Sequence, residues 1–298
     1  MKTLLGLVRA MRPHQWVKNF FIFAPILFAH EWDKQGLFLR VSATFLIFCL
    51  TASGIYLLND VVDRKADRLH PRKRERPIAA GVVSAALATA VGVALVASGL
   101  AWAAFGLANK NVVAVICTYV GIQIAYTGWL KRIAIVDVLC IASGFVLRLL
   151  AGGTAAWVDA SAWIIVCTIF ISLFLALCKR RHEVISLGDT AAAHRAILAD
   201  YPAALLDQFI GAVMACTLVT YALYTVDERT IRAHHLKPEP ILAITLPFVI
   251  FGMFRYLLLV YRREGGGSPT STLLRDVPMM VNGVLYAATV FAVLKFAH

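Results

Sequence analysis

Long apolar segments alternate with short polar connections along the chain. A helix needs about 20 mostly apolar residues to cross a bilayer, and nine stretches are candidates. They lie near residues 17–30, 38–60, 82–107, 111–130, 133–155, 161–178, 205–226, 240–261 and 277–297. The first is short and contains Pro25, which predicts a tilted or kinked helix. Because the connections leave no room for a soluble domain, the pattern predicts an all-α, polytopic membrane protein with a single transmembrane domain over residues 1–298.

Composition and charge narrow the classes of function. Hydrophobic residues make up 60% of the chain and charged residues 15%, against roughly half and a quarter in soluble proteins. The net charge of +12 would suit a nucleic-acid partner. In a membrane protein, however, the expected partners of such a charge are anionic lipid headgroups and phosphorylated substrates. We therefore expect no nucleic acid to bind.

The distribution of Lys and Arg predicts the orientation in the membrane. Most of them lie near the N-terminus and in the connections after the second, fourth, sixth and eighth segments. Cytoplasmic connections carry an excess of these residues. The N-terminus and these four connections are therefore expected on the cytoplasmic side of the cell (inner) membrane. After nine spans, the C-terminus is expected on the opposite side.

The segment after the second apolar stretch carries the most concentrated chemistry. Asp60, Asp63 and Asp67 recur at three- and four-residue spacing, so they would share one face if the helix continues through them. Carboxylates placed in this way repel one another unless a cation lies between them. Mg²⁺ commonly takes one or two carboxylates and completes its shell with water and substrate phosphates. A charged loop that only ends a membrane helix would explain the neighbouring Lys and Arg residues, but not three spaced acids.

Three further polar clusters lie at the ends of other segments. R-P-H-Q-W-V-K-N at residues 12–19 is either a membrane-surface anchor or part of a site to which Lys18 belongs. Lys131 precedes Asp137, a carboxylate close to hydrocarbon that needs a cationic partner. C-K-R-R-H-E at residues 178–183 provides Lys and Arg side chains that can hold phosphate oxygens, and one carboxylate.

Arg148 is the deepest charged residue of the predicted spans. It lies eleven residues beyond Asp137, which is about 16 Å along a helix. An arginine at such a depth usually faces the interior of the bundle, where it marks a substrate path or a buried pair. The sequence leaves both interpretations open.

The order of spans and motifs resembles the UbiA superfamily of intramembrane prenyltransferases. The resemblance rests on N-D-x-x-D-x-x-x-D at residues 59–67 and on Y-T-G-W-L-K-R at residues 126–132. Four stretches resemble one branch of it more closely, the decaprenyl-phosphate phosphoribosyltransferases. They are the segment 12–19, D-R-x-H-P-x-K-R-x-R-P-I-A-A-G at 67–81, L-R-x-x-A-G-G at 147–153 and K-R-x-x-E at 179–183.

This resemblance implies a nine-helix bundle around a central cavity open to the cytoplasm. It also implies Mg²⁺-dependent transfer of 5-phosphoribosyl from phosphoribosyl pyrophosphate to a polyprenyl phosphate. Quinone- and haem-pathway members carry a second aspartate cluster after the sixth helix, where this chain has K-R-R-H-E. The replacement favours a lipid monophosphate acceptor over a prenyl diphosphate donor. Two alternatives stay open, namely a prenyl diphosphate-dependent transferase with an aromatic or haem acceptor, and a transporter or lipid-binding protein without catalysis.

The residue chemistry and the resemblance together define the candidate site. Asp60, Asp63 and Asp67 are the predicted Mg²⁺ ligands and the centre of catalysis. The candidate substrate-binding residues are Lys18, Asn59, Arg68, Arg74, Tyr126, Lys131, Asp137, Arg148, Lys179, Arg180 and Glu183. The sequence leaves open the length of the isoprenoid and whether the chain forms a homo-oligomer.

Overall fold

The fold is helical throughout the part of the chain that the structure describes. The structure, a computed structural model, describes residues 2–28, 34–69, 73–187, 196–233, 241–262, 272 and 275–296. Within these ranges every regular element is a helix and no residue belongs to a strand, which confirms the all-α class. The predicted far-side position of the C-terminal His298 lies outside the described residues.

Eight helices in the described ranges are long and apolar enough to cross a membrane. They match eight of the predicted segments, so the chain is a multi-pass membrane protein. The first predicted segment is instead divided between η1, a 3₁₀ helix over Pro13–Phe23, and the short α2 over Ala24–Phe28. The division falls just before Pro25, whose ring excludes the backbone hydrogen bond that a continuous helix requires there. The count of nine spans stays a prediction.

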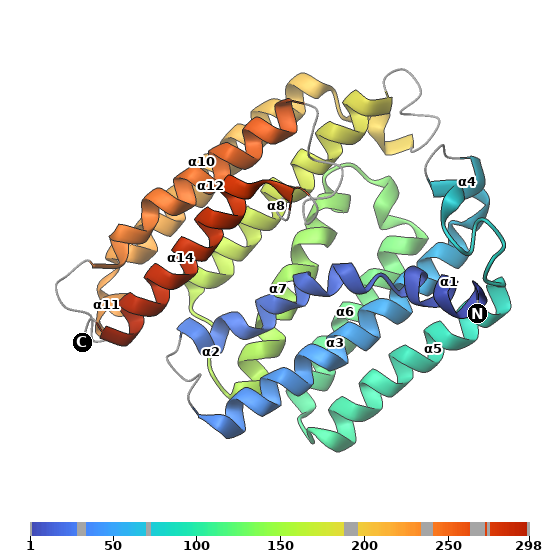
Figure 1. The fold of residues 1–298 in the computed structure, drawn as a ribbon, viewed down its shortest axis with the longest axis horizontal. Coiled ribbons are helices and arrows are strands. Elements are labelled where there is room, and N and C mark those ends of the chain that lie inside the picture. The colour runs from blue at the N-terminus through green and yellow to red at the C-terminus, as the bar shows by residue number, and fades with distance from the viewer. Residues whose placement is uncertain are drawn as a thin grey trace. The chain divides into compact units, whose positions relative to one another are not determined.

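The chain divides into two compact units, Met1–Ala160 and Ser161–His298. That they form one domain stays a prediction. The first unit contains η1 and α2 together with the following helices (Figure 1): α1 (Lys2–Met11), α3 (Gln35–Val62), α4 (Arg64–Leu69), η2 (Lys73–Glu75), α5 (Ala85–Ala101), the π-helical turn η3 (Trp102–Gly106), α6 (Lys110–Gly128), η4 (Leu130–Arg132) and α7 (Val136–Ala156).

Two helices form the centre of the first unit. Most of α3 and of α7 is buried, whereas only a small share of α5 and of α6 is buried. The buried core joins Phe48 of α3, Ile116 of α6 and Ala151 of α7 to Ile22 of η1. In Figure 1, α3 runs beside α5, and the two backbones approach closely at Gly54, where an added Cβ would lie 2.6 Å from the Gly92 carbonyl oxygen. Small residues permit such close helix packing in membranes.

The second unit packs α8 (Ala162–Leu187) against α10 (Ala203–Val226), and α12 (Leu246–Tyr261) against α14 (Val277–Phe296). Among its described residues, this unit also contains the short elements η6 (Ala196–Asp200), α11 (Glu228–Ala233) and η7 (Ile241–Thr245). The first helix of this unit continues past its predicted end at residue 178. The predicted binding residues Lys179, Arg180 and Glu183 therefore belong to a helix and not to a connection.

Candidate functional site: an aspartate motif bridged by arginines

The aspartate motif lies across the junction of two helices. α3 ends at Val62, and Asp63 caps it with near-helical angles, φ −83° and ψ 0°. The backbone N–H of Asp63 donates to the Asn59 carbonyl at 2.9 Å, and that of Asp67 donates to the Asp63 carbonyl at 2.8 Å. α4 therefore follows α3 almost directly, with a single turn residue between the two helices.

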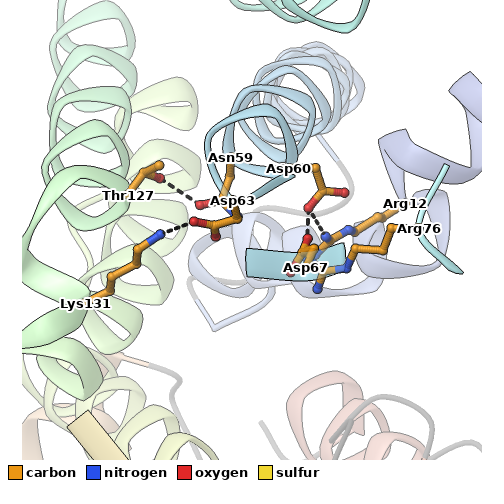
Figure 2. Close-up of polar contacts among 8 residues, drawn as sticks. All are labelled: Arg12, Asn59, Asp60, Asp63, Asp67, Arg76, Thr127 and Lys131. Atoms are coloured by element: carbon orange, nitrogen blue, oxygen red, sulfur yellow. Dashed lines mark hydrogen bonds and ion pairs between the residues drawn. The ribbon is translucent and has the colours of Figure 1, made fainter. Parts of the chain in front are cut away.

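Two of the three carboxylates meet the same arginine. Asp60, only 2% exposed, accepts hydrogen bonds from Arg12 Nη2 at 2.5 Å and from Arg76 Nη1 at 3.0 Å. The same Arg76 Nη1 donates to Asp67 Oδ2 at 2.7 Å (Figure 2). Burial raises the pKa of the Asp67 carboxyl, and the neighbouring Arg76 acts in the opposite direction. Since a buried carboxylate is costly without a counter-charge, these arginines stabilise the motif.

The third carboxylate has a different partner. Asp63 accepts a hydrogen bond from Lys131 Nζ at 2.5 Å, and the adjacent Asn59 accepts one from Thr127 Oγ1 at 3.0 Å. Figure 2 shows this second pair of contacts on the other side of the α3 terminus from Asp60. Tyr126 lies next to Thr127 in the last turn of α6. The end of α3 is thus tied to the connection between α6 and α7.

The three carboxylates therefore do not share one face, contrary to the expectation from a continuous helix. Asp60 and Asp67 pair with Arg76, whereas Asp63 pairs with Lys131. Among the described residues, no group of three or more His, Cys, Asp or Glu side chains is placed to hold one metal ion. Asp60 and Asp67, however, both reach Arg76 Nη1. A cation at that point would have two carboxylate ligands, which is a number that Mg²⁺ commonly takes from a protein. By number and type of ligand, this donor pair fits Mg²⁺.

Arg148 is buried among neutral partners. Its Nε donates to Asn19 Oδ1 at 2.7 Å, its Nη1 to the Gly144 carbonyl at 2.7 Å, and its Nη2 to the Tyr119 hydroxyl at 3.2 Å. The guanidinium also lies 5.7 Å from the centre of the Phe145 ring, close enough for a cation–π contact. The sequence left open whether Arg148 marks a substrate path or belongs to a buried pair. The structure shows it in buried contacts with three neutral groups, and these contacts connect α7 to η1.

The segment 12–19 packs against the helices instead of only anchoring the chain at the membrane surface. Trp16 Nε1 donates to Ser53 Oγ of α3 at 3.1 Å, and Asn19, which is 1% exposed, donates to Cys49 Sγ of the same helix. Lys18, between them, is partly exposed. Trp16 and Asn19 of this motif are therefore fixed against α3, and Asn19 also contacts Arg148 of α7.

The other predicted residues of the first unit lie in different environments. Arg68 Nε donates to the Ala79 carbonyl at 3.0 Å and so fixes the connection after α4. Arg74 of η2 is exposed, and Asp137 is fully buried in the first turn of α7. Neither Arg12 nor Arg76 was among the site residues predicted from the sequence. Both arginines were visible within motifs, but their pairing with the aspartates depends on the tertiary fold.

In the second unit, charged contacts hold the C-terminal end of α8, which the sequence predicts on the cytoplasmic side. Arg180 is 1% exposed and pairs with Glu183 one turn further on. Arg181 Nε donates to Asp207 Oδ1 of α10 at 2.5 Å, and its guanidinium lies 3.6 Å from the centre of the Tyr261 ring. The Tyr261 hydroxyl donates to the same carboxylate oxygen at 2.7 Å. This Arg181–Asp207–Tyr261 clamp connects α8, α10 and α12 where α8 carries its predicted phosphate-binding residues.

We expect Arg181→Gln to destabilise this unit. The substitution removes the ion pair and the ring contact, and the loss should be about 1 kcal/mol because Asp207 stays accessible to water. Thermal unfolding of the purified protein measures it. Arg262→Gln, which removes an exposed arginine at the end of α12, is the matched control. An equal shift for both variants would contradict the clamp.

Comparison with known proteins places this helical architecture in a family. Residues 20–275 match the model of the UbiA prenyltransferase family, and the chain belongs to that family. It is 35% identical to the decaprenyl-phosphate phosphoribosyltransferase of Mycolicibacterium smegmatis, over 98% of this chain and 93% of the relative. It is 36% identical to the Corynebacterium glutamicum protein of the same name, over 98% of this chain and 87% of the relative.

Solved structures show the same fold. The structure of a UbiA homologue from Archaeoglobus fulgidus bound to GPP and Mg²⁺ superposes with a TM-score of 0.71 at 20% identity, over 97% of this chain and 99% of that one. Both levels of the resemblance predicted from the motifs are thereby confirmed, the superfamily by the family model and the branch by the names of the relatives.

Proposed function

We propose that this protein transfers 5-phosphoribosyl from phosphoribosyl pyrophosphate to a polyprenyl phosphate and releases pyrophosphate, in a Mg²⁺-dependent reaction. The observation that carries the proposal is identity of 35–36% over 98% of the chain to enzymes named decaprenyl-phosphate phosphoribosyltransferase. The convergence of Asp60 and Asp67 on one cationic atom supports a metal at the motif. A Mg²⁺-bound relative of the same fold supports the choice of ion.

The proposed reaction breaks the bond between ribose C1 and the pyrophosphate oxygen and forms a bond from C1 to an oxygen of the lipid phosphate. The departing pyrophosphate keeps the electron pair. Asp60, Asp67 and, after a rotation, Asp63 would hold the metal, and bound Mg²⁺ would neutralise the charge that develops on the leaving group. A phosphate monoester is already anionic at pH 7, since its second pKa is about 6. No side chain is therefore needed as a strong general base.

The basic residues predicted from the sequence are proposed to bind the phosphate groups. Lys131 lies beside Asp63. Its ammonium would therefore be close enough to bind the pyrophosphate as it leaves. Lys179 and Arg180 stand at the position where other members have a second aspartate cluster, and we assign them to phosphate oxygens. Glu183, paired with Arg180, would fix the guanidinium and a ribose hydroxyl. Lys18, Arg74, Tyr126, Asp137 and Arg148 stay candidates for substrate contact.

The orientation belongs to the same proposal. Phosphoribosyl pyrophosphate is a water-soluble polyanion, and the aspartate motif lies in the connection with the highest density of Lys and Arg. By the positive-inside tendency, we place this motif and the N-terminus on the cytoplasmic side of the cell membrane, with the C-terminus opposite. The polyprenyl chain would lie between helices, in contact with the bilayer.

A direct comparison of two donors tests this function. Purified protein is incubated with Mg²⁺ in two parallel reactions, one with ribose-labelled phosphoribosyl pyrophosphate and a polyprenyl phosphate, the other with a labelled prenyl diphosphate and an aromatic acceptor. We expect labelled, solvent-extractable lipid product from the first reaction alone. Product from the second reaction alone would reject the proposal in favour of a prenyltransferase.

A further inference from the structure

Two arginines balance the charges of two carboxylates in the aspartate motif. Asp60 and Asp67 contribute two negative charges, and Arg12 and Arg76 contribute two positive ones through the ion pairs described above. Arg76 Nη1 lies at 3.0 Å from one carboxylate and 2.7 Å from the other. A metal ion held by both carboxylates would compete with the Arg76 guanidinium for them.

We propose that Arg76 is a displaceable counter-ion of the metal site. In the metal-free protein its guanidinium bridges Asp60 and Asp67, and on metal binding it leaves the carboxylates and contacts the pyrophosphate of the substrate. The second half of this inference rests on the proposed function, because it requires a pyrophosphate-bearing substrate. Arg76 would thus be both a competitor of Mg²⁺ and a substrate-binding residue.

The surroundings of Arg76 allow its side chain to move while its backbone stays in place. Its backbone N–H donates to the Lys73 carbonyl at 3.0 Å, and its carbonyl accepts from the Ala80 N–H at 2.8 Å. The next residues are anchored by Ile78 and Val83, both fully buried in an apolar cluster. The Arg76 side chain itself is 28% exposed. A long, partly exposed side chain on a fixed backbone can exchange partners without unfolding its segment.

Arg12 has a different position and stays with the carboxylate. It contacts Asp60, and its guanidinium lies 5.0 Å from the centre of the Tyr56 ring. Its backbone is in the left-handed region, with φ 55° and ψ 57°, between α1 and η1. When Arg76 leaves, Arg12 still compensates the buried Asp60. Release of Arg76 therefore changes the charge around Asp67 most.

This exchange couples metal binding to substrate binding. Without substrate, Mg²⁺ must displace a charge-assisted pair of hydrogen bonds, so its affinity is reduced. With pyrophosphate groups present, the displaced guanidinium gains a new anionic partner, to which arginine can bind through two N–H groups. Each ligand then favours the other, as thermodynamic linkage requires. The site would bind Mg²⁺ weakly when the metal is alone, and more tightly when the pyrophosphate-bearing substrate is also present.

Mn²⁺, used as a spectroscopic substitute for Mg²⁺, tests the exchange without substrate. Electron paramagnetic resonance measures its affinity for the wild type and for Arg76→Gln. We expect the variant to bind Mn²⁺ more tightly by roughly tenfold, because hydrogen bonds to charged groups no longer compete for the carboxylates. The metal-free variant should also unfold at a lower temperature than the wild type, and added Mg²⁺ should restore most of the loss.

The matched control is Lys65→Gln. Lys65 is an exposed residue of α4, so this variant removes one positive charge near the motif without removing the bridge. Equal tightening of Mn²⁺ binding in both variants, or none in Arg76→Gln, would overturn the proposal. If Arg76→Gln does not fold, Arg76→Lys replaces it, since an ammonium keeps the charge but cannot reproduce the fork of the guanidinium. Weaker Mn²⁺ binding in that variant would also overturn it.

The substrate half of the inference has its own measurement. In the phosphoribosyl transfer assay, Arg76→Gln should raise the KM for phosphoribosyl pyrophosphate by roughly tenfold relative to Lys65→Gln. Failure of the proposed function is distinguishable, because the wild type would then give no labelled lipid at all while Mn²⁺ binding still responds to Arg76. Transfer with an unchanged KM in Arg76→Gln would reject the contact to pyrophosphate.

Discussion

Replacing Asp67 with Asn is expected to reduce phosphoribosyl transfer by about a thousandfold, as removal of one pre-organised electrostatic group at a reacting centre typically does. The side chain is 5% exposed and lies at the α4 side of the motif, where it shares Arg76 with Asp60. The amide keeps the shape but loses the charge that a metal ligand needs. The initial rate of labelled lipid formation measures the effect, with unfolding temperature as the check on folding.

Glu75→Gln is the control for this prediction. Glu75 is an exposed acid of η2, close in sequence to the motif, so its loss changes the net charge equally. We expect it to keep close to the wild-type rate. If folded Asp67→Asn protein retained more than about a tenth of that rate, the carboxylate would have no role as a metal ligand, because loss of a charged ligand costs far more than one factor of ten.

Gly152→Ala is expected to abolish most of the folded protein. An added Cβ would lie 1.8 Å from the Ile22 carbonyl oxygen and 2.7 Å from its carbon. Because both contacts are with backbone, α7 and η1 must separate. We expect a loss of about 3 kcal/mol, the upper end of the range for overpacked sites. The yield of monodisperse protein and its unfolding temperature measure the loss.

Gly144→Ala tests the same substitution on the same helix. There the nearest atom to an added Cβ is Arg148 Nη1 at 3.4 Å, an ordinary contact, so this variant should fold as the wild type does. Normal yield of Gly152→Ala would contradict the close packing of α7 on η1. The pair of variants also tests a structural account of L-R-x-x-A-G-G, in which Arg148 and Gly152 both hold η1, one through Asn19 and the other through Ile22.

The helices could be predicted from the sequence because the signal for each is local. An apolar run of membrane length marks a span whatever its neighbours are. Two features of the fold, the conformation of η1 and the length of α8, could not be predicted from apolar runs. The 3₁₀ conformation of η1 is held by packing against α3 and α7, which no run of apolar residues indicates. The extension of α8 beyond residue 178 was missed because Lys, Arg and Glu resemble a loop by charge, although they are good helix formers.

The acidic residues of the candidate site could be predicted from the sequence, but the cations that pair with them could not. The spacing of Asp60, Asp63 and Asp67 is visible in one short segment. Arg12, in contrast, precedes its partner Asp60 by 48 residues, and Lys131 follows Asp63 by 68. Only the packing of α1 and of the α6–α7 connection around α3 brings these cations to the motif. Local spacing also could not show that Asp63 pairs with a different cation from the one that Asp60 and Asp67 share.

The most direct test of the central claim follows both products of one reaction. Purified protein receives phosphoribosyl pyrophosphate, Mg²⁺ and a polyprenyl phosphate, and pyrophosphate release is measured together with the mass of the extracted lipid. We predict one pyrophosphate for each lipid whose mass increases by one phosphoribosyl group, and neither product with Asp63→Asn. Pyrophosphate release without a modified lipid, or full activity of Asp63→Asn, would contradict transfer at the aspartate motif.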